Sequence, residues 1–142
     1  MTSAAPPAPP PVPRLLRWSL LVSGPLNLLG ASLFAPPGTA LRALTGVPDA
    51  PPLYAWTVSL WVLAFGIAYA HAGWTGRADR TLLVLGAVGK VVFVALMAVA
   101  AAGGDVPVST AIASAPDLVL AAVFLRGLRH LPRTAPATAE PR

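Results

Sequence analysis

Residues 82–127 read LLVLGAVGKVVFVALMAVAAAGGDVPVSTAIASAPDLVLAAVFLRG. Two long apolar runs, 82–102 and 108–127, are separated by the short segment 103–107, and each run carries one charged residue near its middle, Lys90 in the first and Asp117 in the second. A helix of about 20 apolar residues spans the hydrocarbon core of a bilayer. The stretch therefore predicts a hairpin of two transmembrane helices. A charge near the bilayer centre persists only with a partner, a water-filled cavity or a function.

Two more apolar runs of similar length precede this hairpin, at 15–34 and 54–73. None of the four runs has the period-2 alternation of a barrel strand, so all four predict helices. We read run 15–34 as a retained helix, because its apolar core is longer than that of a signal peptide. The prediction is an all-α, four-transmembrane-helix bundle over residues 14–130. It is flanked by a disordered, proline-rich N-terminal tail, 1–13, and a disordered C-terminal tail, 131–142.

The composition places the chain among membrane proteins. Of its 142 residues, 56% are hydrophobic and only 11% are charged, whereas soluble domains have about 25% charged residues. The absence of cysteine excludes disulfides and thiolate metal sites. The two histidines lie on separate segments, so neither a metal nor a cofactor is expected. The net charge of +5 comes from arginines at the ends of the apolar runs, which predicts contact with the lipid bilayer and not with nucleic acid.

The distribution of arginines predicts the orientation. With four crossings, the two termini and the segment between the second and third runs lie on the same side of the membrane. Positively charged segments next to transmembrane helices stay in the cytoplasm, so both termini are predicted to be cytoplasmic. The predicted inner side holds Arg14, Arg17, Arg77, Arg80, Arg126, Arg129 and Arg133, and the outer side holds Arg42.

Lys90 and Asp117 are predicted to meet near the bilayer midplane. Lys90 lies 14 residues before Gly104, where the hairpin turns, and Asp117 lies 13 residues after it. At about 1.5 Å of rise per residue, their depths differ by only about 1.5 Å. A lysine side chain bridges the usual gap between packed helices. Two readings stay open: a buried ion pair that fixes the register of the hairpin, or a proton-linked or ligand-binding site.

Other polar residues fall at a similar depth. Two interpretations apply to Asn27, Ser59 and Ser114. In the first, they line a polar cavity together with Lys90 and Asp117. In the second, they belong to a tightly packed bundle interior. His71 lies near the inner end of the second run, below Tyr69. These two residues are a candidate proton relay between Asp117 and the cytoplasm; the alternative is that His71 is an ordinary interfacial histidine.

The proline-punctuated segment 35–53 separates the first two runs. Within it, residues 39–45 are predicted to form one or two helical turns, with Thr39 as the N-cap and Gly46 as the C-terminal glycine. Leu41 and Leu44 would then lie on the membrane surface, with Arg42 among the headgroups. A proline-stiffened loop is the alternative. The segments 75–81 and 103–107 are short, so the helices that each one joins are predicted to be antiparallel neighbours.

The stretch 56–125 resembles a group of small bacterial four-helix integral membrane proteins that have no assigned activity. The similarity rests on Trp61, Phe65, Gly66 and Tyr69 in the second run, on residues 85–90 (LGAVGK) in the third, and on Asp117 and Phe124 in the fourth. The general shape of these proteins is similar to DoxX-like bundles. The resemblance supports the architecture of a four-helix membrane protein and draws attention to Lys90 and Asp117. We expect the bundle to lie in a bacterial inner membrane.

Three functions are compatible with these features. The leading hypothesis is a non-enzymatic accessory or small-ligand-binding protein whose Lys90–Asp117 pair organises a polar core. The second is a small proton- or ion-coupled transporter that works as a homodimer or in a larger complex, because four helices enclose little space. The third is a membrane-embedded enzyme acting on a lipid-like substrate, with Asp117 or His71 as acid or base. No nucleophile motif or phosphate-binding loop supports catalysis.

Overall fold

The computed structural model describes residues 12–131 and, within that range, contains only helices and their connections. The elements are α1 (Arg14–Phe34), α2 (Thr39–Thr45), α3 (Pro52–Thr75), α4 (Arg80–Gly103), α5 (Val108–Ser114), α6 (Pro116–Gly127) and the 3-10 turn η1 (Leu128–His130). The predicted all-α fold is confirmed. The two predicted tails lie outside the described residues, except for residues 12, 13 and 131.

Three described segments are long and apolar enough to cross a membrane: α3, α4, and the continuous stretch from α5 to η1. A fourth is added if α1 and α2 are taken together, although the two helices are bent by 100° relative to one another. α1 is 21 residues long, but two arginines, three serines and Asn27 lower its mean hydropathy. By length and composition, the described residues thus contain three segments able to span a membrane, or four if α1 and α2 together form one.

The fourth predicted helix, 108–127, is present but is interrupted for one residue, Ala115. It divides into α5 and α6 at Pro116, whose nitrogen has no hydrogen to donate to the carbonyl of Ile112. The N–H of Ala115 donates to that carbonyl instead, at 3.0 Å. The break makes Pro116 the first residue of α6 and places Asp117 in its first turn.

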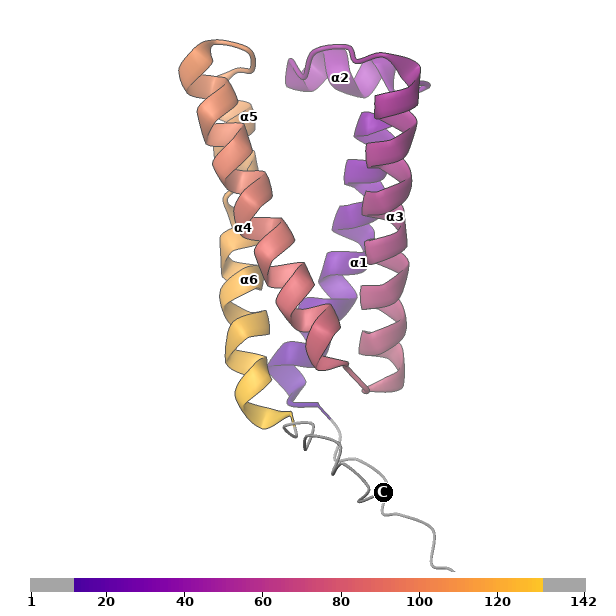
Figure 1. Cartoon of the computed structure of the whole chain (residues 1–142), viewed down its shortest axis with the longest axis vertical. Helices are drawn as coiled ribbons and strands as arrows, with labels where there is room; N and C mark the ends of the chain where they lie inside the picture. Colours follow the sequence, from indigo (N-terminus) through magenta and orange to yellow (C-terminus); the bar gives the residue numbers. More distant parts are fainter. Residues whose placement is uncertain (1–11, 132–142) are drawn as a thin grey trace, which may run out of the picture.

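The helices form two halves, which diverge toward the end of the molecule that carries α2 (Figure 1). In one half α1 packs along α3, and in the other α4 packs against α5 and α6. Glycines bring α1 and α3 close together: a Cβ added to Gly66 would lie 2.8 Å from Cβ of Asn27, and one added to Gly73 would lie 2.8 Å from Cγ of Leu21. Small residues allow such close helix contact.

The prediction that the second and third apolar runs pack as neighbours is wrong. α3 and α4 are joined by the short connection 76–79 but do not pack along their lengths. A short connection holds only the adjoining helix ends together. The long face of α3 is already covered by α1, through the glycine contacts described above. The prediction for the other short segment is correct, because α4 packs against α5 and α6.

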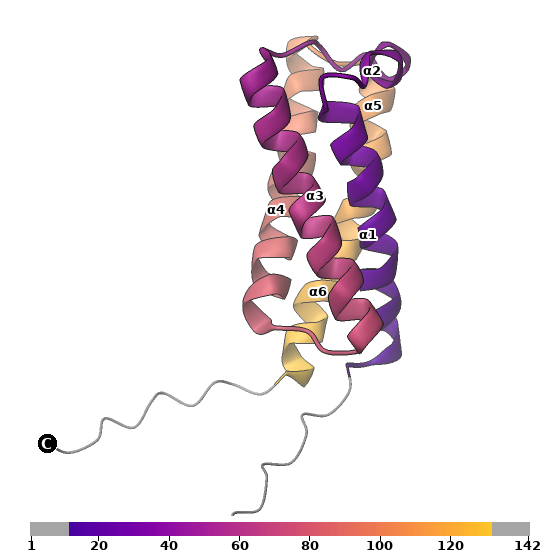
Figure 2. The ribbon, with the colours of Figure 1, turned by 90° about the vertical axis from the view of Figure 1, so that its right-hand side faces the viewer.

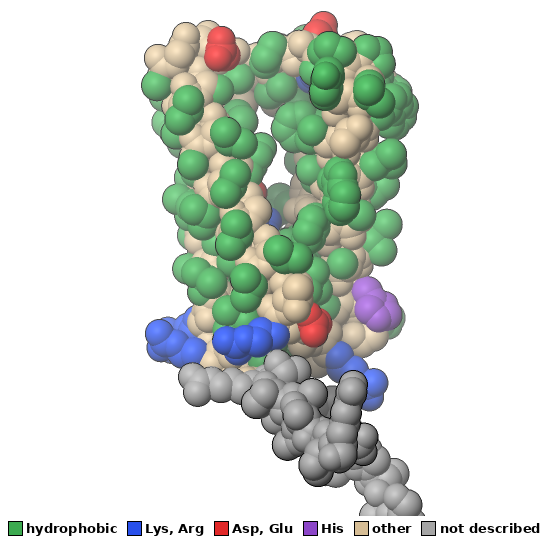
Figure 3. Space-filling view, in the orientation of Figure 1, with side chains coloured by type: hydrophobic (Ala, Val, Ile, Leu, Met, Phe, Trp, Pro, Cys, Tyr) green, Lys and Arg blue, Asp and Glu red, His purple; other side chains and the backbone are tan. Residues whose placement is uncertain are grey.

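The packed core lies at one end of the molecule, which we call the basic end. Leu16, Leu20, Leu83 and Phe124, from α1, α4 and α6, are at most 2% exposed there. The end is named for the arginines that gather around it (Figure 3): Arg14, Arg17, Arg77, Arg80, Arg126 and Arg129. The core joins the two halves here.

At the basic end, side chains form hydrogen bonds with the backbone groups that are unpaired at the helix termini. Arg17 donates to the carbonyls of Gly73 and Trp74 at the C-terminus of α3, and Arg80 donates to the carbonyl of Leu128. The carboxylate of Asp79 caps α4 by accepting from the backbone N–H groups of residues 81 and 82. These N–H bonds lower the pKa of Asp79 below its ordinary value.

The short helix predicted at 39–45 is present as α2, which lies across the opposite end (Figure 2). Gly46 ends it in the left-handed conformation, with φ 67°, as predicted. Thr39 is not its N-cap: it is the first helical residue, and Gly38 precedes it without a side-chain cap.

Arg42 was predicted to lie among lipid headgroups, and this is wrong. Its side chain is buried and pairs with Asp49, with 2.9 Å between Nε and Oδ1. The last carbonyls of a helix lack intrahelical donors, so a guanidinium finds several acceptors where α1 ends. Arg42 donates to the carbonyls of Leu33, Ala35 and Pro36.

The far end of α2 reaches the other half of the molecule. The hydroxyl of Thr110 in α5 donates to the carbonyl of Thr45. The Cα of Gly46 lies so close to Pro107 that an added Cβ would be 2.6 Å from the proline ring. The two halves are therefore connected at both ends, by the core at the basic end and by α2 at the other.

Candidate functional site

Lys90 of α4 and Asp117 of α6 meet between these two connections. Nζ of Lys90 lies 2.6 Å from Oδ1 of Asp117. The lysine side chain is 6% exposed and the aspartate side chain is 22% exposed. The ion pair is formed, but the side chain of Asp117 is not fully enclosed by the protein.

Tyr69 of α3 lies beside the pair. Nζ of Lys90 is 5.8 Å from the centre of the Tyr69 ring, within the range of a cation–π interaction. Tyr69 fits there because Gly86 of α4 has no side chain: an added Cβ would lie 2.5 Å from the tyrosine hydroxyl. The ring also packs against Phe65 and Phe124, with centroids 5.9 Å and 5.3 Å away.

A cavity of about 310 Å³ adjoins the pair on the side of α3; we call it the α3 cavity. Its lining is mostly apolar and aromatic, and its strongly polar groups are Asn27, Lys90 and Asp117. This combination of an apolar wall with a few polar groups is typical of small-molecule sites. The other lining residues are Leu26, Gly30, Phe34, Trp61, Val62, Phe65, Tyr69, Leu85, Gly86, Gly89 and Phe93.

A second cavity, of about 270 Å³, lies on the side of α2 and α5; we call it the α5 cavity. Asp117 lines both cavities, as do Phe34 and Phe93. These two phenylalanines are in edge-to-face contact, with centroids 6.3 Å apart, and connect α1 to α4. The space-filling view in Figure 3 shows the hollow between the two halves.

The other predicted polar residues have different roles. Asn27 lines the α3 cavity, and its amide donates to the carbonyl of Val62 at 3.0 Å. Ser59 is buried and donates to the carbonyl of Ala31 at 2.8 Å, so it joins α3 to α1 away from both cavities. Ser114 lines the α5 cavity and donates to the carbonyl of Ala111 in its own helix.

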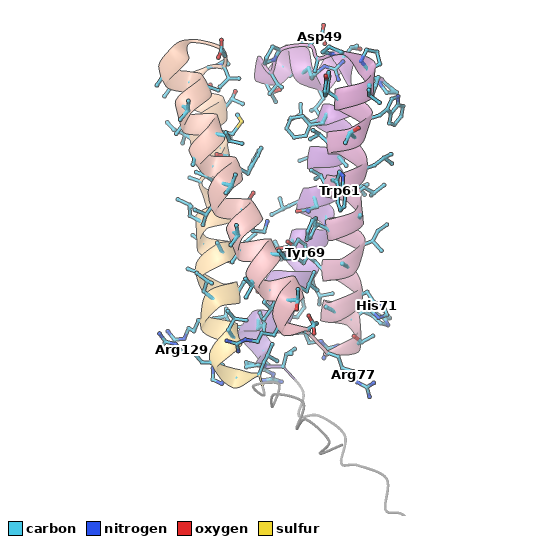
Figure 4. The ribbon with its side chains drawn as sticks, in the orientation of Figure 1. Asp49, Trp61, Tyr69, His71, Arg77 and Arg129 are labelled. Atoms are coloured by element: carbon cyan, nitrogen blue, oxygen red, sulfur yellow. The ribbon has the colours of Figure 1, made fainter. Side chains whose placement is uncertain are left out.

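His71 and Tyr69, the candidate proton relay, point in different directions (Figure 4). Tyr69 is buried beside Lys90, whereas the exposed His71 lines neither cavity. The structure therefore brings Tyr69 to the pair and leaves His71 on the outer face of α3. In residues 12–131, no group of three or more His, Cys, Asp or Glu side chains could hold a metal ion.

Sequence reasoning missed the aromatic wall of the α3 cavity. Phe65 precedes Tyr69 by four residues and Phe93 follows Lys90 by three. Both spacings place the two residues on one helix face, so the sequence carried a signal that these rings accompany the polar groups.

Compared with known proteins, the chain matches no family model, no curated protein and no solved structure. The resemblance to small DoxX-like bundles stays a prediction. The fold and the site define a class only: an α-helical protein with segments able to span a membrane and an ion pair between α4 and α6 beside a cavity.

Proposed function

We propose that this chain is a multi-pass protein of the bacterial inner membrane, with four spans, that binds a small ligand without transforming it. One observation carries the proposal: the Lys90–Asp117 pair lines a cavity instead of lying inside the packed core. An ion pair whose only role was to fix the register of two helices would be expected inside the packed core. Polar groups that face a cavity near the bilayer centre need additional hydrogen-bonding partners. A ligand that hydrogen-bonds to the pair would supply them.

The arginines support an orientation with both termini in the cytoplasm. The basic end holds nearly all of the described arginines, and Arg42 at the opposite end is occupied by carbonyls of its own chain. Under the positive-inside rule, the basic end faces the cytoplasm and α2 lies at the outer surface.

Native mass spectrometry of the full chain in nanodiscs of bacterial membrane lipid tests ligand binding. The wild type should retain a small molecule other than bulk phospholipid. The double variant Lys90→Met with Asp117→Asn should lose it while keeping its helicity. Ser59→Ala is the matched control, because it removes a buried polar group that lines neither cavity. Equal retention by the wild type and the double variant would contradict the proposal.

A second candidate function is proton- or ion-coupled transport. It is favoured by the fact that Asp117 lines both cavities. Carboxylates inside a membrane domain are common members of proton pathways, and a carboxylate that borders two cavities is able to pass a proton from one to the other. Vesicles loaded with a pH-sensitive dye and containing the protein should then show a proton flux that Asp117→Asn abolishes. No difference from protein-free vesicles would eliminate transport of protons.

A further inference from the structure

We propose that the ligand is a neutral lipophile with a hydroxyl head group, and that it enters the α3 cavity from the bilayer between α3 and α4. This inference rests on the proposed binding function and adds the chemical class of the ligand and its route.

The pair itself argues for a neutral ligand. Lys90 and Asp117 already neutralise one another at 2.6 Å, and the rest of the cavity lining holds no other charged side chain. A charged head group would either separate the pair or add an uncompensated charge in a medium of low dielectric constant, and both are costly. A neutral head group leaves the ion pair intact.

The hydrogen-bonding groups argue for a hydroxyl. The ammonium of Lys90 has three N–H bonds, and among the described residues it donates to Oδ1 of Asp117 alone. Oδ2 of Asp117 accepts from no group in that part of the chain. A hydroxyl accepts from Lys90 and donates to Oδ2 at the same time. A carbonyl or ether only accepts and would leave the second carboxylate oxygen unpaired.

The size and lining of the cavity argue for a long apolar body. A volume of about 310 Å³ corresponds to roughly ten water molecules, enough for a head group and the first part of a chain. Phe65 and Phe93 form part of the wall, and Trp61, which also lines the cavity, is 65% exposed. The remainder of the ligand would extend past Trp61 into the lipid.

The route follows from the separation of α3 from α4. These helices do not pack along their lengths, and the residues at the opening are apolar. Leu85 is 51% exposed there, and an added Cβ at Gly89 would meet no atom within 4 Å. The opening lies in the apolar part of α4, so it faces hydrocarbon chains and not water.

Photolabelling tests both the ligand class and the route. The probe is a long-chain primary alcohol that carries a diazirine, added to vesicles containing the full-length protein. The fatty acid and the trimethylammonium analogue of the same length serve as anionic and cationic comparisons. Mass spectrometry of the digested protein locates the adducts, which should fall on cavity residues such as Trp61 and Phe65.

Gly89→Phe should block the opening and reduce alcohol labelling of the cavity by about tenfold, which corresponds to about 1.4 kcal/mol of binding free energy. Val88→Phe is the matched control, since the neighbouring Val88 is 54% exposed and lines neither cavity. Leu85→Trp narrows the same opening and replaces Gly89→Phe if thermal unfolding shows that the latter does not fold.

Each outcome bears on a different part of the inference. Strong alcohol labelling that Gly89→Phe removes and Val88→Phe leaves intact supports it. Stronger labelling of the cavity by the fatty acid or the ammonium probe overturns the neutral ligand but leaves the binding function standing. Equal labelling of the two phenylalanine variants overturns the route. Failure of the binding function itself would appear separately, as the absence of any retained molecule in the nanodisc experiment.

Discussion

Nζ of Lys90 lies 2.6 Å from Oδ1 of Asp117, although 27 residues separate the two in the chain. The contact joins α4 to the first turn of α6, beside a cavity that α1 and α3 also line. The two opposite charges therefore neutralise one another at the border of this cavity.

Substitutions of Lys90 and Asp117 should have strongly non-additive effects on the free energy of unfolding. Lys90→Met leaves a lone carboxylate and Asp117→Asn leaves a lone ammonium, so each single variant should lose about 3 kcal/mol of unfolding free energy. The double variant should lose much less, because no charge is left unpaired. Denaturant unfolding of the four proteins in detergent measures the coupling. Additive losses would show that Lys90 and Asp117 do not stabilise one another.

The close packing of α1 on α3 should depend on Gly66. A Cβ at this position would lie 2.8 Å from Cβ of Asn27 and 3.2 Å from the carbonyl oxygen of Gly24. We expect Gly66→Ala to destabilise the protein by about 1–3 kcal/mol through overpacking. Gly89→Ala is the control: nothing lies within 4 Å of its added Cβ, so it should gain up to about 1 kcal/mol from helix propensity. Equal thermal shifts for both would contradict this account.

Arg42 should hold α2 against the end of α1. Replacing it with methionine removes its donors to three carbonyls, and hydrogen bonds from a charged donor contribute about 1.5–3 kcal/mol each. Hydrogen exchange of residues 39–49 should accelerate. Asp49→Asn should have little effect, since its side chain is 85% exposed and exposed ion pairs contribute at most about 1 kcal/mol. Unchanged exchange in Arg42→Met would refute the anchoring role.

The helix cap made by Asp79 should cause the free energy of unfolding to decrease as the pH falls into the acid range. Its pKa is lowered from 3.8 in the folded protein, so its contribution is present above that value and is lost as the pH falls through the lowered pKa. At neutral pH, Asp79→Ala should cost about 1 kcal/mol. This difference from the wild type should shrink in acid, whereas Asp79→Asn, which caps without titrating, should differ from Asp79→Ala by a constant amount. Thermal unfolding against pH measures all three proteins.

The proposed orientation can be tested with single cysteines, because the chain has none of its own. Asp49 and Arg129 lie at opposite ends of the molecule (Figure 4). In intact cells, a membrane-impermeant maleimide should label Asp49→Cys and should reach Arg129→Cys only after permeabilisation. The reverse pattern would invert the orientation.

Part of the site could be predicted from the sequence. The depths of Lys90 and Asp117 follow from residue counts along two helices joined by a short turn, because the rise of a helix is constant. The roles of Asn27 and Ser59 could not be predicted: both donate to carbonyls of the facing helix, and which carbonyl is within reach depends on how α1 and α3 cross.

Hydropathy and helix rise are properties of local stretches, so the all-α class, the approximate position of each apolar helix and the facing charges could be predicted from the amino acids alone. Three features became known only from the folded chain: α3 packs on α1 and not on α4, Arg42 points inward, and Asp117 lines two cavities. These features depend on contacts between residues that are distant in the sequence. Glycines set how closely two helices approach, and the unpaired carbonyls at a helix end decide where a distant arginine binds.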